Sequence, residues 1–177
     1  MQDLERLADL IRQRNAIEVE ITKITGRPAL LGPIGEYVAA RVFRIELPTS
    51  ANEKGVDGRF QEGALGGATV NIKWYAKREG VLDLVTTEPL PDYYLVLTGP
   101  EGAAMSSRGQ TRPWRLTAVY LFNARDLAAA QRARGVAVGI SSSVPQHFWE
   151  AAEIYPRLQS SLIALSEEQK RLLALFA

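Results

Sequence analysis

The chain contains no cysteine and only one histidine, His147. Without cysteine it can form no disulfide, no thiolate zinc site and no cysteine nucleophile. A single histidine excludes a site built from several imidazoles and leaves a Ser-His-Asp arrangement with little support. Any bound metal must therefore be held by oxygen ligands, which favours Mg²⁺ or Mn²⁺.

Long apolar runs and an excess of one charge are also missing. The 177 residues carry 21 basic and 20 acidic side chains, so the net charge of +1 indicates no general attraction to nucleic acid. No apolar run approaches the roughly 18 residues that cross a bilayer, and the N-terminus lacks the pattern of a signal peptide. We expect a cytoplasmic, soluble protein with no membrane partner, folded as a single domain over residues 1–177.

Hydrophobic periodicity predicts two helices at the start of the chain. Residues 2–24 carry leucine and isoleucine at helical spacing, and Gly26-Arg27-Pro28 ends this helix. A second helix is predicted from Pro33, with proline at the first helical position, to about Phe43.

Capping boxes at Ser143-x-x-Gln146 and Ser166-x-x-Gln169 predict C-terminal helices within about residues 145–176. A further helix is expected at about 124–134, ending at Gly135. The other predicted elements are strands at about 44–48, 54–61, 68–75, 93–97, 114–122 and 136–140.

The glycine-rich segment 62–67 predicts a hairpin turn between the second and third strands. If Phe60 pairs near Val70, Asp57 lies opposite Lys73. The element pattern indicates an α/β protein with a central mixed β-sheet flanked by helices, with a core over about residues 33–123.

Four side chains in these elements could form one site. Glu36 lies on the second helix and is aimed toward the body of the protein, and Asp57 lies between two glycines on a strand. Asn71 and Lys73 alternate on the next strand and so share one face.

This set of residue types fits the hydrolysis of a phosphodiester. That reaction needs a divalent cation, oxygen ligands that hold it and a positioned water. Asp57, the Asn71 side chain and the Ile72 backbone carbonyl would be metal ligands, with Glu36 in support. The Lys73 ammonium could contact the phosphate or help to deprotonate the water.

Glu36 on a helix, Gly55-Val56-Asp57-Gly58 on a strand and Asn71-Ile72-Lys73 on the next resemble the PD-(D/E)XK, or restriction-endonuclease-like, phosphodiesterases. The whole chain also resembles an uncharacterised bacterial domain family within that superfamily. The resemblance implies an αβββαβ core with N- and C-terminal helical additions. It also implies Asp57 and Asn71 at metal-ligand positions, Lys73 as the catalytic lysine and Glu36 as the helix acid.

Two positions depart from that pattern. Val56 replaces the usual proline, and Asn71 stands where an acid is expected, which removes charge from the metal site. Glu79 and Asp83 are candidates to compensate. The segment after Asp83 is also short for the helix expected between the third and fourth strands.

Arginines without acidic neighbours between Gly102 and Arg125 predict a basic surface that binds phosphates. From it we select Arg108 and Arg112 as nucleic-acid-binding residues, with Lys77 and Arg78 adding to the same patch. An ordinary solvated loop is the alternative. DNA is the expected partner, with RNA as a second choice.

Each site residue also has a structural alternative. Asp57 could be a turn residue, Lys73 a charge on an edge strand, and Glu36 a complement to the helix dipole. The function expected from the site is a Mg²⁺- or Mn²⁺-dependent nuclease, and the alternative is an inactive member of the same fold that binds nucleic acid or protein.

In a third interpretation the chain is purely an interaction protein, and the helices at 2–24 and 166–176 form an oligomer interface. A homodimer is the oligomer expected.

Overall fold

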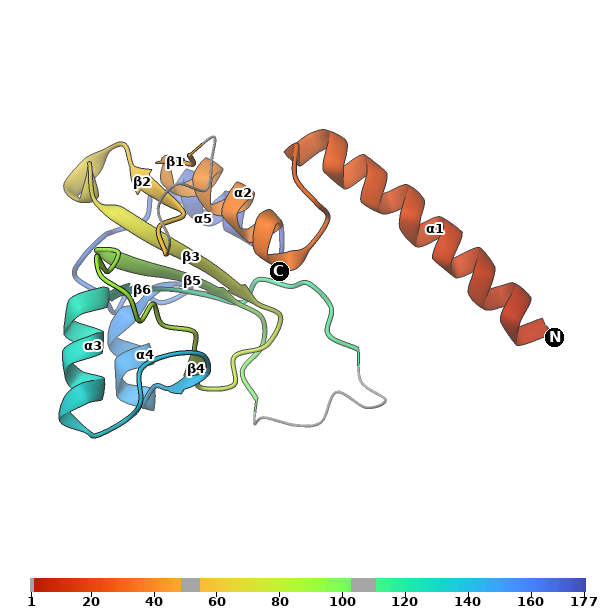
Figure 1. Cartoon of the computed structure of the whole chain (residues 1–177). Coiled ribbons are helices and arrows are strands. Elements are labelled where there is room, and N and C mark those ends of the chain that lie inside the picture. The colour runs from red at the N-terminus through yellow and green to blue at the C-terminus, as the bar shows by residue number, and fades with distance from the viewer. Residues whose placement is uncertain (1, 49–54, 103–110) are drawn as a thin grey trace.

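A mixed β-sheet forms the centre of the protein (Figure 1). The computed structural model describes residues 2–48, 55–102 and 111–177. Neighbouring strands are antiparallel except for the parallel pair β3–β5, which confirms the predicted α/β class and mixed sheet. In sheet order the six strands are β1 (Ile45–Glu46), β2 (Gly58–Phe60), β3 (Thr69–Tyr75), β5 (Tyr93–Thr98), β6 (Ala118–Asn123) and β8 (Glu153–Tyr155).

Helices cover both faces of this sheet. Helices α2 (Leu31–Phe43) and α5 (Glu167–Ala174) lie on one face, and α3 (Ala124–Ala133) and α4 (Gln146–Ala152) lie on the other (Figure 1). Because side chains alternate along a strand, the central strands must be apolar at every position to bury both faces. The run Leu95-Val96-Leu97 of β5 is fully buried for this reason.

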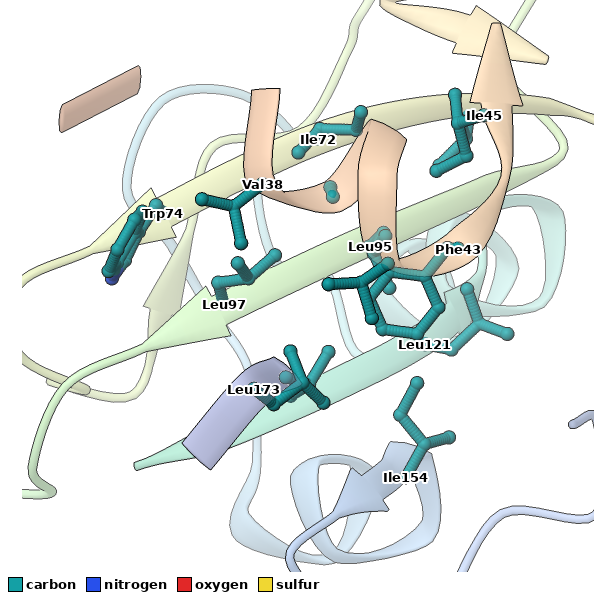
Figure 2. Close-up of a cluster of buried hydrophobic side chains, with 14 of the residues drawn as sticks. Val38, Phe43, Ile45, Ile72, Trp74, Leu95, Leu97, Leu121, Ile154 and Leu173 are labelled. Atoms are coloured by element: carbon teal, nitrogen blue, oxygen red, sulfur yellow. The ribbon is translucent and has the colours of Figure 1, made fainter. Parts of the chain in front are cut away.

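The core under α2 and α5 is the larger one. Figure 2 shows Val38 of α2 over Ile72 and Trp74 of β3, while Phe43 lies nearer Leu95 and Leu121 and Leu173 of α5 lies near Leu97. On the other face Trp149 of α4 makes edge-to-face contacts with Tyr120 and Phe122, with ring centroids 4.9 and 5.1 Å apart. Such contacts add to the stability given by burial alone.

Helix α1 (Gln2–Thr25) extends away from this body (Figure 1). None of its residues is buried, although Ile21 packs partly against the main core. The predicted helix at 2–24 is thus confirmed, and Gly26 ends it with a positive φ of 65°. Within residues 2–48, 55–102 and 111–177, no helix is both long and apolar enough to cross a membrane.

The predicted helix starts were partly wrong. Helix α2 begins at Leu31, so Pro33 is the third helical residue, where its missing N–H still breaks no intrahelical bond. The Ser166 capping box is confirmed by hydrogen bonds in both directions with Gln169. The box predicted at Ser143 is absent, because α4 is capped by Pro145, which offers no side-chain acceptor.

The strand predicted at 136–140 is also wrong. That segment turns instead, with Ser141 at a φ of 56° and the Ser142 hydroxyl accepting from the Gly139 N–H at 2.8 Å. The strand that follows is β7 (Ser142–Ser143), which pairs with β4 (Val81–Leu82) in a separate two-stranded sheet. Strand β8 was not predicted, because its three residues follow α4 directly.

The connection between β3 and β5 differs from the αβββαβ pattern. Residues 76–92 contain β4 and no helix, so the expected helix between the third and fourth core strands is missing. The Asp92 carboxylate instead accepts the N–H and the hydroxyl of Thr69, both at 2.8 Å, and joins the starts of the two parallel strands. The β2–β3 hairpin was predicted, and its turn contains the short 3₁₀ helix η1 (Gly63–Leu65).

Candidate functional site

The β2–β3 register places Asp57 opposite Asn71. Gly58 pairs with Val70, and the Asp57 N–H donates to the Val70 carbonyl at 2.8 Å. The predicted pairing of Asp57 with Lys73 was therefore wrong by two residues. The turn closes earlier than expected, since the Phe60 N–H already bonds the Ala68 carbonyl.

The Asp57 carboxylate continues the ladder where strand β2 has ended. Its Oδ2 accepts a hydrogen bond of 2.6 Å from the backbone N–H of Ile72. Burial raises the pKa of Asp57, while this hydrogen bond and the charges of Lys73 and Arg27 act against that rise. Asp57 is therefore held in a fixed place at the edge of β3, which a simple turn residue would not be.

Both glycines around Asp57 are required by the geometry. Gly55 has a φ of 80°, and a Cβ there would lie 2.8 Å from the Val85 side chain. A Cβ on Gly58 would lie 2.6 Å from the Glu46 carbonyl oxygen of the neighbouring strand. A larger residue at either position would displace the acidic side chain between them.

Asn71 is buried, with 3% of its surface exposed. Its Nδ2 donates to the Gly55 carbonyl at 3.1 Å, but its Oδ1 has no hydrogen-bond partner among the described residues. A buried polar atom without a partner carries a desolvation cost of about 1–3 kcal/mol. This oxygen is thus a free acceptor next to the Asp57 position.

The Ile72 backbone carbonyl lies on the same side of β3 as Asp57, the side that faces β2. The N–H and C=O of a strand residue point to the same side of the strand. Because the Ile72 N–H points to Asp57, its carbonyl faces the same edge, beyond the end of β2. The predicted ligand positions Asp57, Asn71 and Ile72 are therefore neighbours in the structure.

Glu36 reaches this edge from α2. It is paired with Arg27, and its side chain is 26% exposed. Burial raises the pKa of Glu36 and the nearby Asp57 raises it further, while Arg27 and Lys73 lower it. Glu36 lies beyond the first helical turn, so complementing the helix dipole does not explain it.

Lys73 lies on the same face of β3 as Asn71, half-buried. Its ammonium lowers the pKa of both Glu36 and Asp57, so the three charges lie within electrostatic reach of one another. β3 lies between β2 and β5, which does not support the edge-strand explanation of this lysine. Glu36, Asp57 and Lys73 are thus within electrostatic reach, and Asn71 lies beside Asp57 in the register. Asn71 and Lys73 alternate with Ile72 and so point to the face of β3 opposite to α2.

Arg27 is the site residue that the sequence did not reveal. In the sequence it appears only as part of the Gly26-Arg27-Pro28 helix end, yet its guanidinium binds Glu36 and acts on Asp57. Only the fold brings the link between α1 and α2 next to the edge of β3. With Arg27 and Lys73 balancing Glu36 and Asp57, the four side chains sum to zero charge.

The oxygen donors suit a hard divalent cation, although they are few. The described residues contain no group of three His, Cys, Asp or Glu side chains that could hold a metal ion. Asp57, Glu36, Asn71 Oδ1 and the Ile72 carbonyl would have to do so together, and the free Asn71 oxygen is the observation that fits this role. Substrate oxygens and water would complete the shell.

The acids expected to compensate for Asn71 are engaged elsewhere. Glu79 pairs with Arg112 at 3.1 Å and with Lys77 at 3.8 Å. Asp83 accepts from the Tyr75 hydroxyl at 3.2 Å and also binds a backbone N–H of the 139–142 turn. Neither carboxylate is part of the candidate site.

The predicted nucleic-acid-binding residues have different surroundings. Arg108 lies outside the described residues. Arg112 is exposed and Lys77 is partly exposed, both beside Glu79. Lys77 follows the C-terminal end of β3, and Arg112 is joined to the same segment through Glu79.

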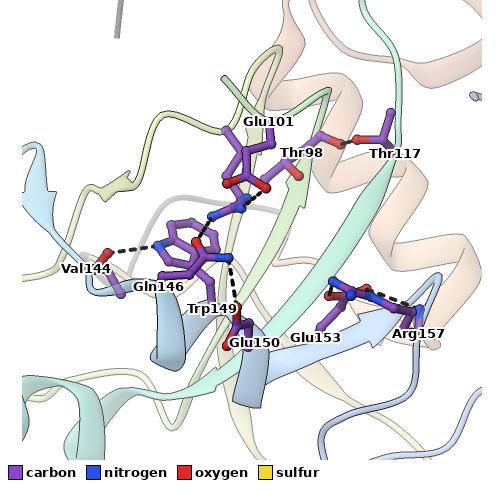
Figure 3. Close-up of polar contacts among 10 residues, drawn as sticks. Thr98, Glu101, Thr117, Val144, Gln146, Trp149, Glu150, Glu153 and Arg157 are labelled. Atoms are coloured by element: carbon purple, nitrogen blue, oxygen red, sulfur yellow. Dashed lines mark hydrogen bonds and ion pairs between the residues drawn. The ribbon is translucent and has the colours of Figure 1, made fainter. Parts of the chain in front are cut away.

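Arg78 has a structural position. Its side chain is 5% exposed and its guanidinium lies 5.3 Å from the centre of the Trp149 ring. It pairs with Glu101 and donates to Gln146 Oε1 at 3.1 Å; Figure 3 shows Glu101, Gln146 and Trp149 around this contact. Binding a phosphate would require breaking these contacts, which does not favour the role predicted for Arg78.

No family model matches the chain, and no curated protein sequence matches it. The fold is of the α/β class, and its site consists of two carboxylates, a buried amide and two cations at the edge of β3. What this site does must be inferred from its chemistry.

Proposed function

We propose that the protein is a metal-dependent phosphodiesterase that hydrolyses nucleic acid, DNA before RNA. The observation that carries the proposal is the buried Asn71 Oδ1, which has no partner among the described residues and lies beside the Asp57 position. A Mg²⁺ or Mn²⁺ ion would satisfy this oxygen and both nearby carboxylates at once.

The proposed roles follow from position. Asp57, Asn71 Oδ1 and the Ile72 carbonyl would hold the cation from the strand, and Glu36 would support it from α2. A bound cation would neutralise charge on the phosphate oxygens. The Lys73 ammonium would contact a phosphate oxygen and orient the attacking water. As the water oxygen bonds to phosphorus, the bond to the leaving ester oxygen breaks, and the proton of the water passes through solvent to that oxygen.

The zero charge of the cluster has a consequence for binding order. Two carboxylates are opposed by Arg27 and Lys73, so the side chains alone attract a divalent cation weakly. A phosphodiester adds negative charge to the same place. We therefore expect metal and nucleic acid to bind together, each strengthening the other.

A second function is an inactive module that binds nucleic acid or protein. It is favoured by the contacts that already satisfy both carboxylates, since Glu36 is paired with Arg27 and Asp57 Oδ2 is bonded to the Ile72 N–H. In that case the neutral cluster stabilises the edge of β3 and needs no cation.

Cleavage assays separate these two functions. Supercoiled plasmid, single-stranded DNA and RNA are incubated with Mg²⁺ or Mn²⁺ and with wild type, Asp57→Ala or Lys73→Ala. Asp126→Ala, which removes an exposed acid on α3, serves as the matched control. Metal-dependent cleavage that both site variants lose and the control keeps supports the phosphodiesterase. Absence of cleavage on every substrate in both metals supports the inactive module.

A further inference from the structure

Helix α1 carries the largest unpartnered apolar surface on the described part of the chain. Seven of the thirteen exposed large apolar side chains lie on it: Leu4, Leu7, Leu10, Ile11, Ile17, Val19 and Ile24. The helix has 24 residues and none of them is buried. At about 1.5 Å per residue it is roughly 36 Å long, and an isolated helix of this kind gains most of its stability from packing.

The apolar residues follow a seven-residue repeat. Leu7 and Ile21 occupy its first position, a, and Leu10, Ile17 and Ile24 its fourth, d. Leu4 and Ile11 widen the same stripe from a flanking position, e. This is the pattern by which two helices pack in a coiled coil, with a and d side chains in the seam.

The opposite side of α1 is charged. An ion pair there joins Asp9 to Arg12, and a second one joins Lys23 to Glu20, which lies at the margin of the stripe. The helix carries five acids and four bases in total: Asp3, Glu5, Asp9, Glu18 and Glu20 against Arg6, Arg12, Arg14 and Lys23. A balanced charge does not favour an anionic membrane or nucleic acid as the occupant of the stripe, because both would require an excess of bases.

We propose that α1 forms an antiparallel coiled coil with α1 of a second copy of this chain. The orientation follows from the charged residues of the stripe. In a parallel pair, Arg14 would face Arg14 of the second copy across the seam, and no flanking charges would match. In the antiparallel pair, Arg14 lies beside Leu10 of the second copy instead, and Arg6 lies opposite Glu20.

The antiparallel pair has an apolar centre and a charged rim. Leu7 lies against Ile17 of the second copy, and Ile11 lies beside its own counterpart near the two-fold axis. Arg14 enters the seam beside Leu10 of the second copy, and its guanidinium turns outward to Glu18 of its own helix, at 2.8 Å, so that the charge lies at the rim. An apolar centre with a polar rim is the ordinary arrangement of a protein interface. The proposal does not depend on the phosphodiesterase site.

The first test is the molar mass by light scattering over a range of protein concentrations. The dimer has twice the 19.5 kDa of one chain. Ile17→Lys places a charge in the seam and is expected to give monomer. Its matched control is Val19→Lys, because Val19 is a β-branched residue of the same helix, 52% exposed against 60% for Ile17, on the outer position of the repeat. The control is expected to remain dimeric.

The orientation is tested by oxidation of single cysteines, which the chain otherwise lacks. Gln13→Cys lies next to the two-fold axis and is expected to form a covalent dimer alone. Leu7→Cys is expected to do so only when mixed with Ile17→Cys. Because no α1 residue is buried, these changes leave the body folded, which circular dichroism checks. A monomer at every concentration overturns the proposal, and so does efficient cross-linking of Leu7→Cys alone.

Discussion

The carboxylate of Asp57 accepts the backbone N–H of Ile72 at 2.6 Å, at the point where β2 stops pairing with β3. This contact places the acid beside Asn71 and turns the Ile72 carbonyl toward the same edge. An acid, an amide and a carbonyl from adjacent strands thus converge, and Glu36 and Lys73 act on the same place. The predictions below test what this arrangement does.

Asn71→Asp should bind Mn²⁺ more tightly than wild type and retain or raise any cleavage activity. One added carboxylate changes the site from neutral to a net charge of −1, and we expect about a tenfold gain in affinity or more. Calorimetric titration with Mn²⁺ measures it. The matched control is Asn123→Asp, since Asn123 caps α3 by accepting two backbone N–H groups and aspartate can do the same. Loss of activity in Asn71→Asp alone would show that the amide is needed for another reason.

Arg27→Gln should also strengthen Mn²⁺ binding, by about tenfold, because it frees Glu36 from its cationic partner. Without Arg27 the pKa of Glu36 should rise further, so the pH at which binding reaches half its maximum should move upward. Arg171→Gln removes an exposed pairing with Glu168 and is the control. Weaker binding in Arg27→Gln would instead make Arg27 a positioning residue that holds Glu36 in place.

Asp57→Asn should stabilise the protein at neutral pH in the absence of metal. Burial raises the pKa of Asp57 in the folded state above its ordinary value of 3.8. Such a group contributes stability below the unfolded pKa and loses that contribution as the pH rises through the folded value. The melting temperature of Asp57→Asn should therefore exceed that of wild type at pH 7, and the difference should shrink as the pH falls toward 3.8. A difference independent of pH would contradict this explanation.

Arg78→Ala should destabilise the fold by about 2 kcal/mol, since the guanidinium packs on Trp149 and Tyr120. Its partner Glu101 is largely exposed, so the change leaves no buried charge behind. Denaturant unfolding measures the loss. Arg132→Ala, an exposed arginine on α3, should change stability by less than about 0.5 kcal/mol. If Arg78→Ala instead reduced DNA affinity without loss of stability, the structural role would be wrong.

Much of the fold could be predicted because periodicity and burial agree in the long elements. The run Leu95-Val96-Leu97 and the helix at 2–24 have patterns that only one kind of element satisfies. The wrong predictions lie where the geometry of a turn decides whether a strand forms. The strand expected at 136–140 is displaced by the turn around Ser141, and β8 is too short to show a period.

The sequence predicted which residues make up the candidate site, but it did not predict which of them contact one another. Glu36, Asn71 and Lys73 are on the elements expected for them, because each depends on local spacing, whereas Asp57 lies just before β2 and not on the strand expected at 54–61. Arg27 reaches Glu36 across nine residues of chain, through a link whose path only the tertiary structure sets. The register of Asp57 depended on the hairpin turn, and the buried position of Arg78 depended on α4, which is remote in sequence.

The most direct test of the metal site is a Mn²⁺ titration of wild type and Asp57→Ala, with and without a non-hydrolysable phosphorothioate oligonucleotide. The account predicts saturable Mn²⁺ binding to wild type that the oligonucleotide strengthens and that Asp57→Ala abolishes. Equal binding by both proteins, or none by wild type even with the oligonucleotide, would contradict a metal site at Asp57.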